Sequence, residues 1–261
     1  MAAETTIEDR RAKVSELISI KGFMPLAQLV QVFGVSESTV RRDLEVLEEQ
    51  GFVHRTYGGA VFVKDTASIK LAFAERETTA LAEKRAIARA VAELVPVNQT
   101  VLINGGTTCR EVARMLSGKH LSVVTNSVPI ASLLWMDLVT EVTLIGGYVY
   151  PRTGVALGPM AVQQLDSLNA TQLILSCAGL CEDGAFNANQ MMVEVERKMM
   201  DAADEVILAV DHSKLGMRSV AKLCDLAEAD VIVTDAGADP AARAWLDGRA
   251  RRVIYAEPDK L

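Results

Sequence analysis

The stretch GVSESTVRRDLEVLEEQGFVHRTYGGAV, residues 34–61, decides how the first part of this 261-residue chain folds. Ser36 can cap a helix by accepting a hydrogen bond from a backbone N–H of its first turn. Val40, Leu44 and Leu47 then recur at helical spacing, which predicts a helix with one buried face. The remaining faces of that helix are left for solvent or for a partner.

The flanking residues complete a small domain. Residues 10–21 have helical apolar spacing, and residues 26–33 have a second apolar stripe between Pro25 and Gly34. After the third helix, two β-prone runs at 52–57 and 60–63 are joined through two glycines, which predicts a hairpin. Three helices and a hairpin in this order are typical of a winged helix-turn-helix.

In that arrangement the third helix projects far enough to enter a DNA major groove about 12 Å wide. Hydroxyls at its start and two adjacent arginines suit phosphates and base edges. The alternative is an ordinary solvated helix. Residues 1–63 hold seven Lys and Arg against nine Asp and Glu in a chain of net charge −7, so local placement must supply the positive charge. The predicted DNA contacts are Ser36, Ser38, Thr39, Arg41, Arg42, Arg55 and Tyr57.

The second part of the chain alternates between apolar runs and helical stretches. Several runs are continuously apolar, as expected for strands that are covered on both faces. The sequence therefore predicts an α/β fold: an N-terminal winged helix-turn-helix plus a larger C-terminal α/β domain with a mainly parallel sheet. The predicted strands are 101–103, 121–125, 142–146, 173–179, 206–210, 230–234 and 252–255.

Polar, glycine-containing loops follow several of these strands. In parallel α/β sheets ligands bind beyond the carboxyl ends of the strands, and helix N-termini there favour anions. Gly-Gly and Thr-Asn pairs also occur in ordinary turns. Four such loops in succession favour a phosphate site, with Lys214 as its cation. The predicted site residues are Asn104, Gly105, Gly106, Thr107, Thr108, Thr125, Asn126, Ser127, Gly146, Gly147, Asp211 and Lys214.

The stretch from Ile18 to Ala60 resembles the head of DeoR-type transcriptional repressors. The matching segments are GFMPLAQL, FGVSESTVRRDLEVLEEQG and RTYGGA. The helix-turn-helix proper of that family would map onto Met24–Asp43. Tyr57 stands where the family usually has His, and a Tyr hydroxyl can still donate to a phosphate.

The resemblance extends over the second part of the chain through three motifs: INGGTT ending at Thr108, VTNS at 124–127 and DHSKLG at 211–216. It implies a domain similar to ribose-5-phosphate isomerase that binds phosphorylated sugars or related metabolites. Asn104 replaces the usual Asp of the first motif, and the stretch 170–177 departs from the family pattern. Glu194 and Lys198 match an acid and a cation of a family helix, and Glu194 joins the predicted effector residues.

The resulting hypothesis is a transcriptional repressor of a carbohydrate operon, controlled by a phosphorylated sugar. Its domains are 1–63 for DNA binding, 64–80 as a linker and 81–261 for effector binding and oligomerisation. The expected partners are double-stranded operator DNA, the effector and further copies of the chain in a homodimer or homotetramer. No enzymatic activity, cofactor, metal or membrane association is expected, and the location is cytoplasmic. The reduced, structural thiols are Cys109, Cys177, Cys181 and Cys224.

Two alternatives remain open from the sequence. One is a sugar-phosphate isomerase-like enzyme with an added DNA-binding head, which needs a positioned base. Its candidate acids are Asp183, Glu194, Glu196 and Asp211. The other is a DNA-binding protein whose C-terminal domain only oligomerises; it predicts that no ligand affects operator binding.

Overall fold

The computed structural model of the chain describes residues 7–21, 23–50, 52–56, 58–62 and 75–258. The chain folds as two compact units, an N-terminal unit, Met1–Leu71, and a C-terminal unit, Ala72–Leu261. The domain bounds expected from the sequence stay a prediction, because most of the expected linker lies outside the described residues.

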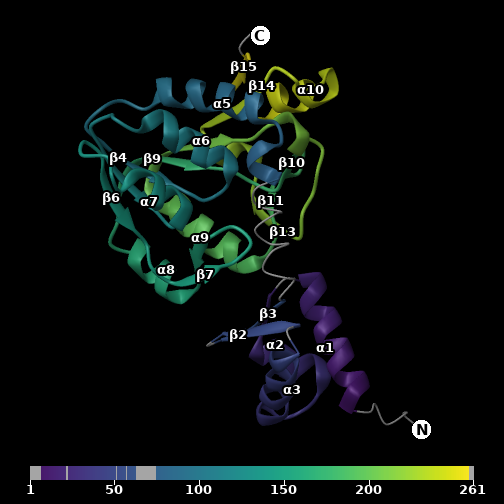
Figure 1. Cartoon of the computed structure of the whole chain (residues 1–261). Coiled ribbons are helices and arrows are strands. Elements are labelled where there is room, and N and C mark those ends of the chain that lie inside the picture. The colour runs from purple at the N-terminus through teal and green to yellow at the C-terminus, as the bar shows by residue number, and fades with distance from the viewer. Residues whose placement is uncertain (1–6, 22, 51, 57, 63–74, 259–261) are drawn as a thin grey trace. The chain divides into compact units, whose positions relative to one another are not determined.

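The N-terminal unit is a winged helix-turn-helix, as the sequence predicts (Figure 1). Its antiparallel sheet has the order β1-β3-β2, so the hairpin gains a third strand that the sequence analysis missed. The elements are α1 (Ile7–Lys21), β1 (Phe23–Pro25), α2 (Leu26–Phe33), α3 (Glu37–Glu49), β2 (Val53–Thr56) and β3 (Gly59–Phe62).

Local chemistry fixes the bounds of these elements. Ser36 caps α3, since its side chain accepts a hydrogen bond from the backbone N–H of Thr39. Gly34 ends α2 in the left-handed region at φ 63°, which a glycine adopts without strain. Gly59 pairs with Pro25, and a Cβ there would overlap the carbonyl of Met24. The second glycine of the Gly-Gly pair is therefore required by the third strand.

Asp43 joins α3 to α1. Its carboxylate accepts hydrogen bonds from Arg10 Nε at 2.6 Å and from Arg11 Nε at 2.9 Å, and Asp43 is only 2% exposed. The apolar face of α3 lies beside this ion pair in the core of the unit. That core contains Val14, Ile18, Met24, Leu29, Val40, Leu44, Leu47, Val53 and Ala60.

The C-terminal unit is built on a seven-stranded sheet in which every described pair is parallel, with the order β15-β14-β12-β9-β4-β5-β6. All seven predicted strands belong to it. Their bounds are β4 (Gln99–Ile103), β5 (Leu121–Thr125), β6 (Glu141–Leu144), β9 (Ala170–Leu175), β12 (Ala203–Ala209), β14 (Val231–Asp235) and β15 (Val253–Ala256).

Helices cover both faces of this sheet (Figure 1). One face packs against α5, α6 and α7 through a single apolar core that includes Ile87, Ile103 and Ile174. From the other face α9 contacts β9 and β12. The helices are α5 (Leu81–Leu94), α6 (Thr107–Leu116), α7 (Val128–Leu134), α8 (Pro159–Leu165), α9 (Gln190–Asp201) and α10 (Pro240–Arg249), with 3₁₀ turns η1 (His212–Lys214) and η2 (Leu226–Glu228).

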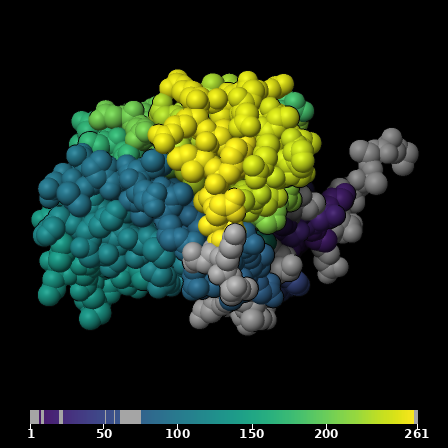
Figure 2. Space-filling model, turned by 90° about the horizontal axis from the view of Figure 1, so that it is seen from above, coloured from purple at the N-terminus to yellow at the C-terminus, as the bar shows by residue number. Residues whose placement is uncertain are grey.

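Five short antiparallel strands were not predicted. They form a hairpin, β7 (Tyr148–Tyr150) with β8 (Val155–Leu157), and a small sheet of β10 (Gly179–Cys181), β11 (Gly184–Asn187) and β13 (Ala221–Cys224). The end of the chain returns to α5, which contacts β14 and β15. In Figure 2 the yellow C-terminal segment lies beside the blue segment that contains α5. None of the helices in the described residues is long and apolar enough to cross a membrane.

The contact between Asp43 and α1 yields a first prediction. Asp43→Asn keeps the side-chain volume but removes the charge that two half-buried arginines share, so the N-terminal unit should lose about 1–3 kcal/mol of stability. Hydrogen exchange of the full chain should show faster exchange in α1 and α3. Glu49→Gln, an exposed change on the same helix, should leave exchange unchanged. Equal protection in both variants would contradict the role given to Asp43.

Candidate functional site

A cavity of about 290 Å³ lies in the C-terminal unit, where the strand order reverses. The chain adds β5 and β6 on one side of β4, and β12, β14 and β15 beyond β9 on the other. Loops that leave β4 and β9 therefore diverge and leave a crevice. Residues after β4, β9 and β12 line it, together with residues from α5, α9 and the β7–β8 turn.

Lys84 places a buried ammonium group at the cavity. It is 4% exposed, and its Nζ donates to the carbonyl oxygens of Arg76 at 2.5 Å and Thr79 at 2.6 Å. Burial lowers the pKa of Lys84, whereas the nearby Asp211 carboxylate raises it and the Lys214 ammonium lowers it further. Two lysines thus act on each other across one small space, which favours binding of an anion.

The loop from Asn104 to Thr108 presents the N-terminus of α6 to the same space. Gly106 has φ 121° and is the N-cap of α6, so no side chain of the cap residue accepts the first N–H groups of the helix. Gly105 is also required, because a Cβ there would overlap Val155. Such a helix N-terminus, with the hydroxyls of Thr107 and Thr108, suits an oxyanion.

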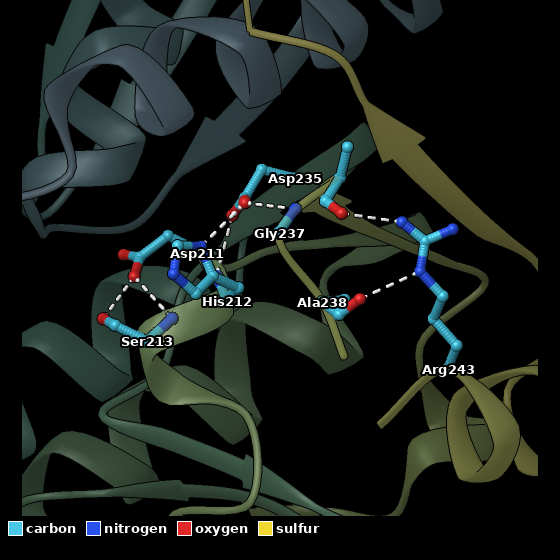
Figure 3. Close-up of polar contacts among 8 residues, drawn as sticks. Asp211, His212, Ser213, Asp235, Gly237, Ala238 and Arg243 are labelled. Atoms are coloured by element: carbon cyan, nitrogen blue, oxygen red, sulfur yellow. Dashed lines mark hydrogen bonds and ion pairs between the residues drawn. The ribbon is translucent and has the colours of Figure 1, made fainter. Parts of the chain in front are cut away.

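The turn η1 carries Ser213 and Lys214 to the cavity. Asp211 and Asp235 hold this turn from two sides (Figure 3). Asp211 caps it, since its Oδ1 accepts from the backbone N–H and hydroxyl of Ser213. Asp235, fully buried at the end of β14, accepts the backbone N–H of His212 at 2.7 Å and lies 2.7 Å from its ring Nδ1. These contacts fix the backbone from which Lys214 extends.

A buried carboxyl group, hydrogen-bonded by two side-chain amides, forms another part of the cavity wall. Glu196 of α9 is 2% exposed and accepts from Nδ2 of Asn104 at 2.9 Å and from Nδ2 of Asn187 at 2.7 Å. Burial raises the pKa of Glu196 to about 7, while the hydrogen bonds from Asn187 and Asn104 oppose the rise. The amide at position 104 is therefore a donor to a carboxylate.

The structure brings about half of the predicted effector residues together. Gly105, Gly106, Thr107, Thr108, Asp211 and Lys214 line the cavity. The others lie outside the cavity as the described residues form it: Asn104, Thr125, Asn126, Ser127, Gly146, Gly147 and Glu194. Asn104 still reaches it through Glu196.

Most of the excluded residues form hydrogen bonds elsewhere in the unit. Thr125 donates its hydroxyl to the carbonyl of Ile103 at 2.6 Å, and Asn126 donates to Ala156. Ser127 caps α7. The backbone N–H of Gly146 donates a hydrogen bond to the side chain of Gln164. Glu194 is exposed on α9. The loops after β5 and β6 lie on the far side of the strand reversal, and this is why their turn chemistry does not reach the cavity.

Sequence reasoning missed seven polar lining residues, and it named an eighth, Glu196, only as a candidate base of the enzyme alternative. One signal was available for Lys84, which stands three residues before Ile87 and seven before Val91 and so shares the apolar stripe of α5. Arg76 and Thr79 belong to the stretch expected to be a linker. The missed residues are Arg76, Thr79, Lys84, Thr153, Ser176, Asn187 and Ser213.

The predicted DNA contacts that the structure describes lie at the N-cap of α3, on α3 and on β2. Ser36, Ser38, Arg41 and Arg42 are exposed and Thr39 is half-buried, while Tyr57 lies outside the described residues. Arg41 pairs with Glu37 at 2.7 Å, and Arg55 pairs with Glu48 at 2.6 Å. Among the described residues Arg42 has neither an ion pair nor a hydrogen bond from its side chain. These DNA contacts stay predictions.

The candidate catalytic acids and the cysteines named from the sequence lie in different places. Of the four acids considered as a base, Asp211 and Glu196 line the cavity, whereas Asp183 and Glu194 are exposed. All four cysteines are buried and free. The described part of the chain contains no group of three or more His, Cys, Asp or Glu able to hold a metal ion.

Residues 10–66 match the family model for the DeoR-like helix-turn-helix domain, and residues 79–236 match the model for the DeoR C terminal sensor domain. The HTH-type transcriptional repressor CsqR of Escherichia coli (strain K12) is 32% identical over 260 residues, 98% of each chain. The glycerol-3-phosphate regulon repressor of the same strain is 31% identical over 229 residues, 87% of this chain and 90% of that protein.

Among solved structures, ribose 5 phosphate isomerase A from Neisseria gonorrhoeae matches with a TM-score of 0.37 and 18% identity over 52% of this chain and 53% of that chain. A TM-score of this size does not establish a common fold.

The pairing of Asn104 with Glu196 yields a second prediction. Asn104→Asp would place a carboxyl 2.9 Å from Glu196, and two buried carboxyls this close cannot both ionise. The folded variant then holds a proton that the unfolded chain releases, so it loses stability as pH rises through the folded pKa. Its deficit relative to the parent should grow by about 1–3 kcal/mol between about pH 5.5 and pH 8.5.

Urea unfolding can be followed by the fluorescence of Trp135 and Trp245, the two tryptophans of the chain, which both lie in the C-terminal unit. Asn169→Asp, an exposed amide in the same unit, is the control and should show no such pH dependence. A deficit of Asn104→Asp that stays constant with pH would rule out the shared proton.

Proposed function

This chain belongs to the DeoR family of transcriptional regulators, and from that membership we propose that it represses a carbohydrate operon under the control of a phosphorylated sugar or related metabolite. The N-terminal unit binds double-stranded operator DNA, and the C-terminal unit binds the effector. Two similar proteins bear the names of transcriptional repressors, and one of those names refers to the glycerol-3-phosphate regulon. Those names support a regulator in preference to an enzyme.

The DNA-binding proposal rests on α3. Its Val40, Leu44 and Leu47 face is buried in the N-terminal unit, and this leaves Ser38 and Arg42 on the opposite, exposed face. An arginine in this position has the planar donor fork that pairs with guanine or with phosphate. Because a helix-turn-helix dimer binds two half-sites, we propose a homodimer or homotetramer as the active form.

The effector proposal rests on one observation above all: a small cavity at the strand reversal combines Lys84, Lys214 and the N-terminus of α6. Each of these groups favours an anion, and together they form an electropositive site suited to an anionic ligand. A phosphate ester of a sugar fits this chemistry. We propose no reaction in this cavity, and incubation with phosphorylated sugars should give no turnover.

Effector binding changes operator occupancy only if the two forms of the protein, bound to DNA and released, differ in effector affinity. An inducer binds the released form more tightly, whereas a co-repressor binds the DNA-bound form more tightly. In both cases a variant that loses effector affinity keeps its operator affinity in the absence of effector. The two sites can therefore be tested separately.

A third prediction addresses the recognition helix. Arg42→Ala should weaken operator binding by about 1–3 kcal/mol, the usual contribution of one arginine contact to a base, without unfolding the N-terminal unit. Gel-shift titrations at one salt concentration measure the change. Arg252→Ala removes the same charge from an exposed position of the C-terminal unit and is the control. If both variants bind the operator as the parent does, α3 is not the recognition helix.

A fourth prediction addresses the anion site. Lys214→Ala should weaken binding of the phosphorylated effector about tenfold to a hundredfold, as expected for one charge-assisted hydrogen bond, and should leave operator affinity unchanged. The measurement is operator occupancy against effector concentration at fixed ionic strength. Lys222→Ala, an exposed lysine outside the cavity, serves as the matched control. Superimposed curves for Lys214→Ala and the parent would remove Lys214 from the site.

A further inference from the structure

Glu196 is a buried acceptor in a cavity whose other charged groups mainly suit an anion. It comes from α9, on the opposite side of the sheet from α5 and its Lys84. Glu196 is 2% exposed and lines the cavity. In the described residues no lysine or arginine forms an ion pair with it. This carboxylate does not contribute to phosphate binding, because both groups are negatively charged.

The two amides beside Glu196 have fixed orientations. Oδ1 of Asn104 accepts the backbone N–H of Gly105 at 2.5 Å, and Oδ1 of Asn187 accepts that of Ala178 at 2.8 Å. The Nδ2 groups must therefore point away from these amides and toward Glu196, where they donate to Oε1 and Oε2. This arrangement presents Glu196 as a hydrogen-bond acceptor held in one rotamer.

The carboxylate retains acceptor capacity after these contacts. An ionised carboxylate offers about four lone-pair sites, and the three contacts from the amides leave about one of them. A second polar group of the cavity is also unused: Thr153 Oγ1 is buried and has no hydrogen-bond partner in the described part of the chain. The Thr153 hydroxyl can donate to an anion, but a ligand that carries only an anion would leave the free lone pair of Glu196 without a donor.

We infer that Glu196 determines effector specificity by accepting a hydrogen bond from a hydroxyl group of the sugar, while the lysines and the N-terminus of α6 hold the phosphate. This inference rests on the proposed function, since it names the residue that distinguishes one phosphorylated polyol from another. A neutral hydroxyl donor satisfies the free lone pair without displacing the two amides. Asn104 and Asn187 act as positioning residues for the carboxylate.

Such a site discriminates strongly against a ligand that lacks the hydroxyl. The missing donor leaves the remaining lone pair of a buried carboxylate unpaired and out of reach of water, which is the costly case for a polar group. Loss of one hydrogen bond to a charged group corresponds to about a tenfold to hundredfold weaker affinity. Inorganic phosphate, which has no polyol part, is expected to lose no affinity when Glu196 is replaced, because the carboxylate only repels it.

The experiment compares the full-length parent with Glu196→Gln and Glu196→Asp by calorimetric titration. The probes are inorganic phosphate, ribose 5-phosphate, glucose 6-phosphate, glycerol 3-phosphate and the available deoxy analogue of each sugar phosphate. Asp201→Asn, which removes an exposed carboxylate from the same helix, is the control. Thermal unfolding monitored by tryptophan fluorescence establishes that each variant folds, and the Asp variant keeps the charge in case the Gln variant does not.

The expected result is an about tenfold to hundredfold loss of affinity for the best sugar phosphate in both Glu196 variants, with no loss of affinity for inorganic phosphate. One deoxy analogue should bind the parent more weakly and respond little to the substitutions, because the paired contact is already absent. An equal loss for inorganic phosphate, or no loss for the sugar phosphate, would overturn the inference and leave the proposed function intact. If no sugar phosphate binds the parent, the proposed function fails with it.

Discussion

The parallel pairing of β4 with β9 is the constraint on which the cavity depends. Ile103 lies opposite Ile174 in this pair, and the backbone N–H of Asn104 extends the ladder by donating to the carbonyl of Ile174 at 2.9 Å. From this point the two halves of the sheet grow in opposite directions. The loops after β4, β9 and β12 must then surround one crevice, and α6 begins at its edge.

The same constraint explains what the sequence could and could not predict. Continuous apolar runs and strand-end glycines are local features, so the seven strands and the Asn104–Thr108 loop were found. Strand order is not a local feature. Asn126 and Gly146 have turn chemistry like that of Gly106, yet their strands lie beyond β4, away from the crevice. The sequence offered Glu196 only as one of four candidate bases, and it is the packing of α9 that brings Glu196 to the cavity.

In the N-terminal unit the net charge gave little guidance, because its acids are used within the fold. Asp43 binds two arginines of α1, and Glu48 binds Arg55. Glu37 holds Arg41. Once such pairs are set aside, Arg42 stands exposed on a helix of a formally acidic segment. The position of a few charges relative to the buried face therefore decides the electrostatics of the recognition surface, and the motif RRD combines both kinds: an exposed arginine and a buried aspartate.

The charges of the cavity explain why position 104 carries a neutral Asn. Arg76, Lys84 and Lys214 contribute cations, and Asp211 and Glu196 contribute carboxylates, so the ionised wall has a formal charge of +1 from three cations and two anions. An Asp at position 104 would oppose Glu196 directly, and full ionisation of both carboxyls would cancel this excess. The neutral amide avoids both effects and also donates to the carboxylate. The replacement thus preserves attraction for an anion in a cavity that already contains an acceptor carboxyl.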